Sequence, residues 1–223
     1  MFPVIEIRDI PDPTRLYALI DRLDTFDAAI FVSPNAVVRG LGALRARREL
    51  PSTLKVIAIG HGSAGELRRH GVASVIVPGG RSDSESLLDL QDLQAVTGRR
   101  IVIFRGEGGR GLLGDTLAAR GATVEHAECY RRIKPQADVA PLLNSCSSGE
   151  VDAFVATSSE GLRNLCGMVG VTGQSQLAEI ALFVPHLRIA STARELGLNS
   201  VIVTHPGDDG LVTAITQYFA ASP

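Results

Sequence analysis

Apolar and polar positions follow one another along the chain in a regular order. Short runs that are apolar at almost every position recur through the sequence, and segments with helical spacing separate them. Near-continuous apolar runs of this length are typical of strands that are buried on both faces of a sheet. The pattern predicts strands over AAIFV (28–32), KVIAI (55–59), SVIV (74–77), RIVIF (100–104), TVEHAE (123–128), AFVAT (153–157), ALFV (181–184) and SVIV (200–203).

Two of the intervening segments carry clear helix signals. The segment 34–50 places Pro34 at the first helical position, which suits a residue that has no backbone N–H. The segment 109–121 stops at Gly121, a typical helix end. Alternating strands and helices favour parallel sheets with helices on both faces, so the predicted class is α/β. In such sheets a ligand is expected at the carboxyl ends of the strands.

The sequence also repeats itself. DAAIFVSPNAV (27–37) resembles DAFVATSSEGL (152–162) at an offset of 125, and SAGELRRHGVASVIV (63–77) resembles IASTARELGLNSVIV (189–203) at an offset of 126. A third block, SESLLDL (84–90), matches 208–215 at an offset near 124. Three blocks in one order at one offset predict two similar α/β domains in tandem.

The two copies differ in extent. The first copy continues through 99–135. In the second copy only the end of this stretch has a counterpart, which is residues 2–9, aligned with 128–135. We therefore expect a strand–helix unit of about 27 residues before Met1 to be lacking from the domain formed by the C-terminal half. That domain is then expected to be the less stable one, with an unfilled strand position or an exposed apolar edge. Restoring the unit is expected to raise its melting temperature.

Composition and charge exclude several classes of protein. Of the 223 residues 45% are hydrophobic and 21% charged, as in a globular chain, and the formal net charge of −2 gives no basic field for nucleic acid. No apolar run is long enough for a membrane helix, and the N-terminus does not resemble a signal peptide. All the basic residues except Lys55 and Lys134 are arginine, which suits bidentate recognition of carboxylates.

Cysteines and histidines give no metal-site pattern. The three cysteines, Cys129, Cys146 and Cys166, form no CxxC pair, which excludes a disulfide scaffold and fits a reducing cytoplasm. The five histidines show no metal-ligand spacing. We expect no metal site.

Serines follow several predicted strands. Ser33, Ser63 and Ser158 each stand near the start of a predicted helix, where a serine caps the free N–H groups. One interpretation is capping alone. In the other, several helix N-termini bind an anion that carries many acidic groups, and the recurrence of such a serine in both copies favours this.

A glycine-rich loop follows the strand 100–104. GEGGRG (106–111) fits the G-x-G-x-x-G dinucleotide fingerprint, with Glu125 and Glu128 about 20 residues further on. Arg105 directly precedes the first glycine, and the motif follows the fourth strand of its domain rather than the first. These two departures favour a tight turn at a helix start as the explanation of the glycines.

Tyr130 lies in CYRRIKP, between the two repeats. A phenol that lines a cleft is a candidate proton donor, while a linker residue is the simpler interpretation. Arg131 and Arg132 are either solvated charges or clamps for carboxylates.

At these residues the chain resembles the uroporphyrinogen-III synthase family. The resemblance covers essentially the whole chain and rests on an ordered set of blocks rather than on one signature. These are FVSPNAV (31–37), VIAIGHGSAGELRRHGV (56–72), SDSESLLDL (82–90), IFRGEGGRGLLGDTLAARGATVEHAECYRR (103–132), ATSSEGLRNL (156–165) and PHLRIASTARELG (185–197). One departure is Ile189, opposite Ser63 in the repeat, where many members carry threonine.

The resemblance implies two flavodoxin-like parallel-sheet domains, of strand order 2-1-3-4-5, joined by a two-stranded linker. One domain is discontinuous and here N-terminally incomplete. Carried over, the inserted domain covers 10–128, antiparallel linker strands cover 2–9 and 129–135, and the second domain covers 136–223.

The resemblance also implies a function. Such lyases cyclise hydroxymethylbilane, a linear tetrapyrrole with eight carboxylates, to uroporphyrinogen III with inversion of the last ring and loss of water. They use no cofactor and no metal. Tyr130 corresponds to the family's linker tyrosine and is the implied acid. Implied substrate ligands are Ser33, Ser63, Ser158, Arg105, Arg110 and Arg188. We expect a cytoplasmic monomer that acts on this small molecule and binds neither nucleic acid nor membrane.

Two other functions stay open at this point. A module of two α/β lobes could bind a tetrapyrrole or another anion without reaction. A nucleotide-dependent enzyme would use the loop 106–111.

Overall fold

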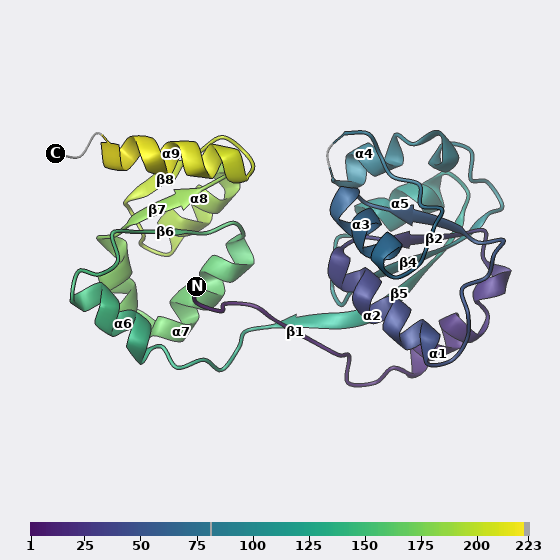
Figure 1. Ribbon diagram of the computed structural model, residues 1–223, viewed down its shortest axis with the longest axis horizontal. Helices are drawn as coiled ribbons and strands as arrows, with labels where there is room; N and C mark the ends of the chain where they lie inside the picture. Colours follow the sequence, from purple (N-terminus) through teal and green to yellow (C-terminus); the bar gives the residue numbers. More distant parts are fainter. Residues whose placement is uncertain (81, 221–223) are drawn as a thin grey trace. The chain divides into compact units, whose positions relative to one another are not determined.

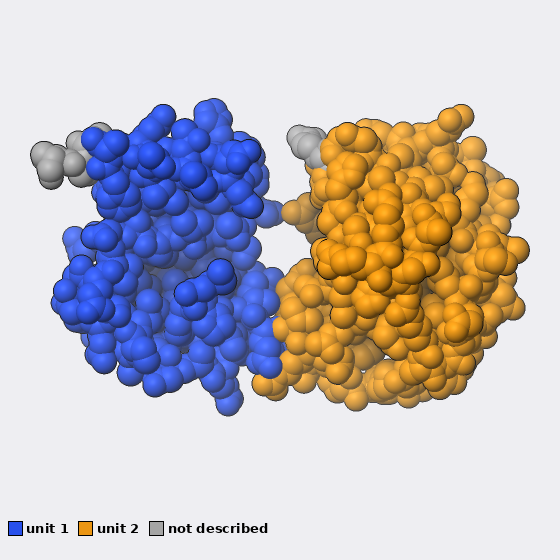
Figure 2. All heavy atoms as spheres, in the orientation of Figure 1, with its two compact units in different colours: residues 1–6, 133–223 blue, residues 7–132 orange. Residues whose placement is uncertain are grey.

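The computed structural model describes residues 1–80 and 82–220. These divide into two compact units. Unit 1 combines residues 1–6 with 133–223, and unit 2 comprises residues 7–132 (Figure 2). Each unit has its own sheet with helices beside it (Figure 1). Within the described residues, no helix has both the length and the apolarity that crossing a membrane requires.

Unit 2 is built on a five-stranded sheet of order β1-β5-β4-β2-β3. Its strands are β1 (Glu6–Arg8), β2 (Ala28–Phe31), β3 (Lys55–Ala58), β4 (Arg100–Gly106) and β5 (Thr123–Ile133). The pairs β2–β3, β2–β4 and β4–β5 are parallel. Every residue of β2 is buried, as are all but the first of β4, which confirms the prediction of strands covered on both faces.

Helices cover both faces of this sheet. Beside one face, α1, α2 and α3 pack on a cluster that contains Phe31 and Phe104, whose rings stack with centroids 4.6 Å apart. Beside the other face, α4 and α5 pack on Ile30 and Ile103. The helices are α1 (Thr14–Asp21), η1 (Leu23–Thr25), α2 (Pro34–Arg45), α3 (His61–Arg69), α4 (Ser84–Leu88), η2 (Gln91–Leu93) and α5 (Leu112–Ala119). The predicted helices 34–50 and 109–121 are thus each shorter than expected.

The order of strands in unit 2 corrects the flavodoxin-like expectation. The predicted strand 74–77 is reduced to a single parallel bridge, in which Ile76 pairs with Ile57 of β3. Taken in chain order, the parallel segments are therefore arranged 3-2-1-4-5, the doubly wound order found in dinucleotide-binding folds, and not 2-1-3-4-5. The third segment extends the sheet beyond β3 because both sides of β2 are already occupied by β3 and β4.

The expected linker strands also differ in extent. The first is only the three residues of β1, and the second is not separate, because β5 runs without interruption from Thr123 to Ile133. The expected domain boundary at residue 128 therefore falls inside a strand.

Unit 1 contains a three-stranded parallel sheet of order β6-β7-β8 in its described residues. The strands are β6 (Ala153–Val155), β7 (Ala181–Val184) and β8 (Val201–Val203). The helices are α6 (Ala140–Ser147), α7 (Ser159–Ala178), α8 (Leu187–Glu195) and α9 (Asp208–Ala220). Gly170, with φ of 67°, kinks α7.

The registers of the strands confirm the internal repeat. In unit 2, Ala28 pairs with Lys55 and Ile57 with Ile76. In unit 1, the positions displaced by the sequence offsets make the same pairs, Ala153 with Ala181 and Phe183 with Ile202. The two units therefore share one strand arrangement at the level of single residues.

The units differ in how the first strand of the repeat is covered. β2 lies between β3 and β4, whereas β6 has only β7 as a neighbour among the described strands. As a result Ile30 is fully buried, but Val155, which occupies the equivalent position, is 45% exposed. An apolar edge with unpaired backbone groups lowers the local stability of a sheet.

We therefore expect the sheet of unit 1 to open more readily than that of unit 2. In hydrogen–deuterium exchange under native conditions, the amides of β7 should exchange faster than those of β2, because fewer buried apolar groups must be exposed to open β7. Equal protection of the two strands would contradict this expectation.

Candidate active site

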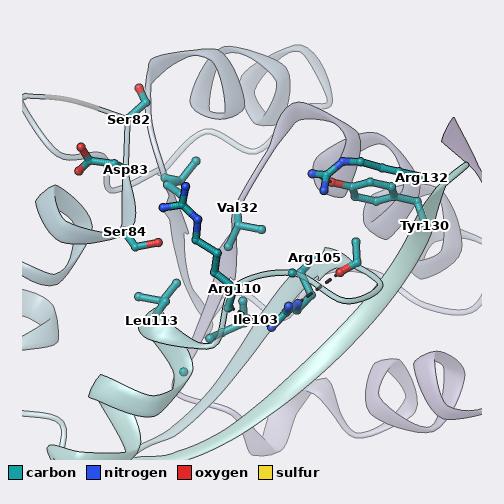
Figure 3. A pocket seen from close by; sticks show the side chains of 14 residues that line it. Val32, Ser82, Asp83, Ser84, Ile103, Arg105, Arg110, Leu113, Tyr130 and Arg132 are labelled. Atoms are coloured by element: carbon teal, nitrogen blue, oxygen red, sulfur yellow. Dashed lines mark hydrogen bonds between the residues drawn. The ribbon is translucent and has the colours of Figure 1, made fainter. Parts of the chain in front are cut away.

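A pocket of about 350 Å³ lies in unit 2 where β2 and β4 end. Phe31 of β2 pairs with Phe104 of β4 in the parallel register, so the residues that follow the two strands meet at one edge of the sheet. Tyr130 and Arg132 enter the pocket from β5, and Arg105 and Arg110 enter it from β4 and the loop after it (Figure 3). This is the carboxyl end of the parallel sheet, where a ligand is expected.

A bulge in β5 determines where Tyr130 points. Arg105 pairs with Glu128 and Gly106 pairs with Tyr130, so Cys129 is an extra residue in the ladder. Residues alternate between the faces of a regular strand, and one extra residue reverses that alternation. Cys129 and Tyr130 consequently belong to the same buried cluster. The Cys129 thiol donates to the Arg105 carbonyl at 3.3 Å, and burial raises its pKa to about 12, so the thiol is a packing group.

Among the described residues, the hydroxyl of Tyr130 has two polar partners. The Ser33 Oγ lies 3.1 Å from it, and the Arg132 guanidinium donates to it from Nη2 at 3.2 Å. Ser33 is fixed because it caps α2 and accepts the Ala36 N–H at 3.0 Å, which confirms its predicted capping role. Tyr130 is one of the residues that line the pocket, but none of its surface is exposed to solvent.

The glycine-rich loop makes room for Tyr130 and Arg105. A Cβ at Gly106 would lie 2.7 Å from Cζ of the Tyr130 ring, and a Cβ at Gly109 would lie 2.9 Å from the Arg105 guanidinium carbon. Gly108 adopts a φ of 67°, as the tight-turn interpretation requires. The glycines are thus explained by packing and turn geometry.

The acidic partner of a dinucleotide site is also engaged elsewhere. Glu125 accepts hydrogen bonds from Arg22 at 2.6 Å and from Arg100 at 3.3 Å, and the Arg22 contact is the largest cause that lowers its pKa. Neither the glycines nor Glu125 favours the nucleotide interpretation.

Arg105 is a buried cation without a carboxylate partner among the described residues. Only 8% of the surface of Arg105 is exposed to solvent. Its guanidinium donates to the carbonyls of Gly106 and Arg110, each at 3.3 Å, and contacts Nδ1 of His126 at 3.5 Å. Burial, and then the charge of Arg105, lower the pKa of His126, which favours the neutral imidazole beside the guanidinium. A buried charge of this kind favours an anion in the pocket.

Arg110 and Arg132 add to this positive charge. Neither pairs with a carboxylate in the part of the chain that the structure describes, whereas many other arginines do, for example Arg39 with Asp9 and Arg47 with Asp21. The one acidic residue that lines the pocket, Asp83, caps α4 by accepting the Ser86 N–H at 2.8 Å. Arg110 extends between Val32 and Ser84 (Figure 3). The pocket therefore suits an anionic ligand.

The remaining candidate residues lie elsewhere. Ser63 does not cap α3, because the helix already begins at His61 and Gly60 occupies the N-cap position. Ser63 is instead buried in the first turn. Ser158 caps α7 in unit 1 by accepting the Gly161 N–H at 3.0 Å, and Arg188 is exposed near the start of α8.

No sequence pattern singled out Asp83, which lines the pocket, or His126, which contacts Arg105. Arg132 was named as a possible clamp for carboxylates, but it was not preferred over its neighbour Arg131. The sequence did carry a signal for Arg132, because residues two apart in a strand lie on the same face and Arg132 therefore shares the face of Tyr130.

The contact between Gly106 and Tyr130 leads to a prediction about stability. We expect Gly106→Ala to destabilise the protein by about 1–3 kcal/mol, because the added methyl group would force the Tyr130 ring out of place. A chemical-denaturation curve measures the loss, and near-ultraviolet circular dichroism reports the tyrosine environment, since the chain has no tryptophan.

The matched control is Gly42→Ala on α2, where an added Cβ meets nothing within 4 Å. That change should stabilise the protein by about 0.5–1 kcal/mol. Equal effects of the two substitutions would refute the packing role of Gly106.

Known proteins resemble this chain over most of its length. The family model described as Uroporphyrinogen-III synthase HemD matches residues 1–213. The uroporphyrinogen-III synthase of Escherichia coli is 34% identical over 217 residues, with 96% of this chain and 88% of the relative covered. That of Salmonella typhimurium is 35% identical over 223 residues, with the same coverage.

Solved structures resemble the fold at lower sequence identity. The uroporphyrinogen-III synthetase of Helicobacter pylori matches with a TM-score of 0.62 and 17% identity, covering 96% of this chain and 91% of that one. The Thermus thermophilus uroporphyrinogen III synthase matches with a TM-score of 0.60 and 21% identity, covering 99% and 87%. With the family match over nearly the whole length, the chain belongs to the uroporphyrinogen-III synthase family.

Proposed function

We propose that the protein cyclises hydroxymethylbilane to uroporphyrinogen III and that the unit 2 pocket holds the acid for this reaction. The observation that carries the proposal is that Arg105, Arg110 and Arg132 line one pocket together with a tyrosine, with no carboxylate partner for any of the three among the described residues. One of them, Arg132, donates to the tyrosine hydroxyl. The substrate brings eight carboxylates, so it supplies the negative charge that the pocket lacks.

The arginines would bind and orient the substrate. A guanidinium forms two parallel hydrogen bonds with a carboxylate, which fixes the direction as well as the position of the acid side chain. A pocket of about 350 Å³ accommodates the acid side chains of one end of the substrate rather than the whole tetrapyrrole. Holding that end while the other closes onto it lowers the entropic barrier to forming the ring.

Tyr130 would supply the proton that the leaving group needs. The C–O bond of the hydroxymethyl group breaks with its electron pair on oxygen, while the phenol proton passes to that oxygen, so that water leaves. The Ser33 hydroxyl, 3.1 Å from the phenol oxygen, then stabilises the phenolate. Tyr130 regains a proton when the final ring carbon loses one.

Ring inversion needs no further group from the chain. The cationic carbon left by water departure is attacked by the last pyrrole ring, and the spiro intermediate rearranges and closes within the bound substrate. No cofactor or metal takes part in the proposed reaction. Ser63 in unit 2, and Ser158 and Arg188 in unit 1, stay proposed ligands for other carboxylates.

Replacing Tyr130 tests the acid. We expect Tyr130→Phe to slow single-turnover ring closure about 10²-fold, the usual value of one general acid, with little change in substrate affinity. Product analysis distinguishes enzymic uroporphyrinogen III from the uninverted isomer that forms spontaneously.

The melting temperature is recorded on the same samples, because Tyr130 is wholly buried. A stable Tyr130→Phe variant with the wild-type rate constant would exclude Tyr130 as the acid. If the wild-type protein binds the substrate but returns it unchanged, the protein is a binding module and the proposed reaction is wrong.

Replacing Arg105 tests the binding of carboxylates. We expect Arg105→Gln to raise KM about tenfold and leave kcat within a few-fold, because the contact is made in the ground state and in the transition state alike. Arg105→Lys should recover only part of the affinity, since an ammonium lacks the planar pair of donors.

Arg99→Gln is the control for loss of one positive charge. Arg99 is 62% exposed and pairs with Asp27 at the other end of the sheet. If both variants change KM equally, net charge rather than a specific contact explains the effect.

A further inference from the structure

Tyr130 poses a geometric problem for the proposed reaction, because an acid must touch its substrate and this side chain has no exposed surface. Something that covers the hydroxyl has to move. The hydroxyl lies close to Ser33, to the backbone at Gly106 and to the side chain of Arg132.

Two of these groups are fixed by the fold. Ser33 caps α2, so displacing its hydroxyl would also leave the Ala36 N–H without its acceptor. Gly106 is held in the β4–β5 ladder, and the next residue, Glu107, donates its N–H to the Tyr130 carbonyl at 2.8 Å. Moving either one would disrupt secondary structure.

Arg132 is free of such constraints. Arg132 is exposed to solvent, and within the described residues no carboxylate pairs with its guanidinium. Tyr130 and Arg132 are two positions apart on one face of β5, and the Arg132 guanidinium carbon lies 5.7 Å from the centre of the Tyr130 ring. Figure 3 shows the arginine lying beside the ring.

We propose that Arg132 is a positioning residue that caps the Tyr130 hydroxyl and uncovers it when a substrate carboxylate binds the guanidinium. Without substrate, the arginine donates to the phenol oxygen and turns the phenol proton toward Ser33. A carboxylate is a stronger acceptor for a guanidinium than a neutral phenol is, so a bound acid side chain draws Arg132 away. The acid is then available only beside a correctly placed substrate. This inference rests on the proposed role of Tyr130.

The first test needs no turnover. Protein labelled with ¹³C at the tyrosine ζ carbon gives signals from only three tyrosines, and Tyr130→Phe identifies the one that matters. We expect Arg132→Gln to shift the Tyr130 signal and Arg99→Gln to leave it in place. Propionate, used as a simple carboxylate, should shift the same signal in the wild-type protein but not in Arg132→Gln. An unchanged Tyr130 signal in Arg132→Gln would overturn the inference whatever the activity.

The second test is a double-mutant cycle on single-turnover ring closure. We expect Arg132→Gln to slow the step about tenfold, because the variant lacks the guanidinium that holds a substrate carboxylate beside the phenol. In the Tyr130→Phe background the same change should slow it less than twofold, because the arginine acts through the phenol. Arg132→Lys should be intermediate.

The outcomes separate the two proposals. An equal effect of Arg132→Gln in both backgrounds would show that the arginine acts independently of Tyr130 and would overturn the positioning role. An inactive wild-type protein would instead refute the proposed function, and the tyrosine signal would still decide whether Arg132 caps the hydroxyl.

Discussion

The single extra residue in β5 is the constraint on which the candidate site depends. Without the bulge at Cys129, a regular strand would place Tyr130 on the opposite face from Cys129, away from Ser33 and the end of α2. With the bulge, the phenol passes over Gly106 and reaches the Ser33 hydroxyl, and Arg132 follows on the same face. Bulges often re-aim a side chain next to an active site, and this bulge directs the Tyr130 hydroxyl into the candidate site.

The architecture was largely predictable because burial on both faces leaves a clear trace in the sequence. Seven of the eight predicted strands coincide with observed strands to within a few residues at most of their ends, apart from β5, which runs on to Ile133. The exception is 74–77, where only Ile76 pairs, because a segment at the edge of the sheet needs few backbone bonds. The repeat was visible for a related reason: equivalent positions such as Ile57 and Phe183 occupy the same register and require apolar side chains in both units.

The site was less predictable because its geometry arises from contacts distant in sequence. A serine before a helical pattern identified Ser33 and Ser158 as caps, but the same reasoning failed for Ser63, since α3 starts at His61 rather than after Ser63. The glycine loop fitted two interpretations, and contacts of the folded chain, such as the closeness of Gly106 to a ring 24 positions away, distinguish them. That Arg105 is buried without an acidic partner among the described residues is likewise a property of the folded chain.

The three arginines of the pocket have a consequence for how the protein behaves in solution. Guanidinium groups without an internal counter-ion attract any small oxyanion, and phosphate or sulfate in a buffer offers a pair of oxygens that can accept the same two hydrogen bonds as a carboxylate. Such ions would occupy the pocket in proportion to their concentration and would also screen its field over roughly 10 Å at 0.1 M ionic strength. The apparent affinity for an acidic substrate is therefore a joint property of the protein and its buffer, and it is highest where chloride is the main anion and is dilute.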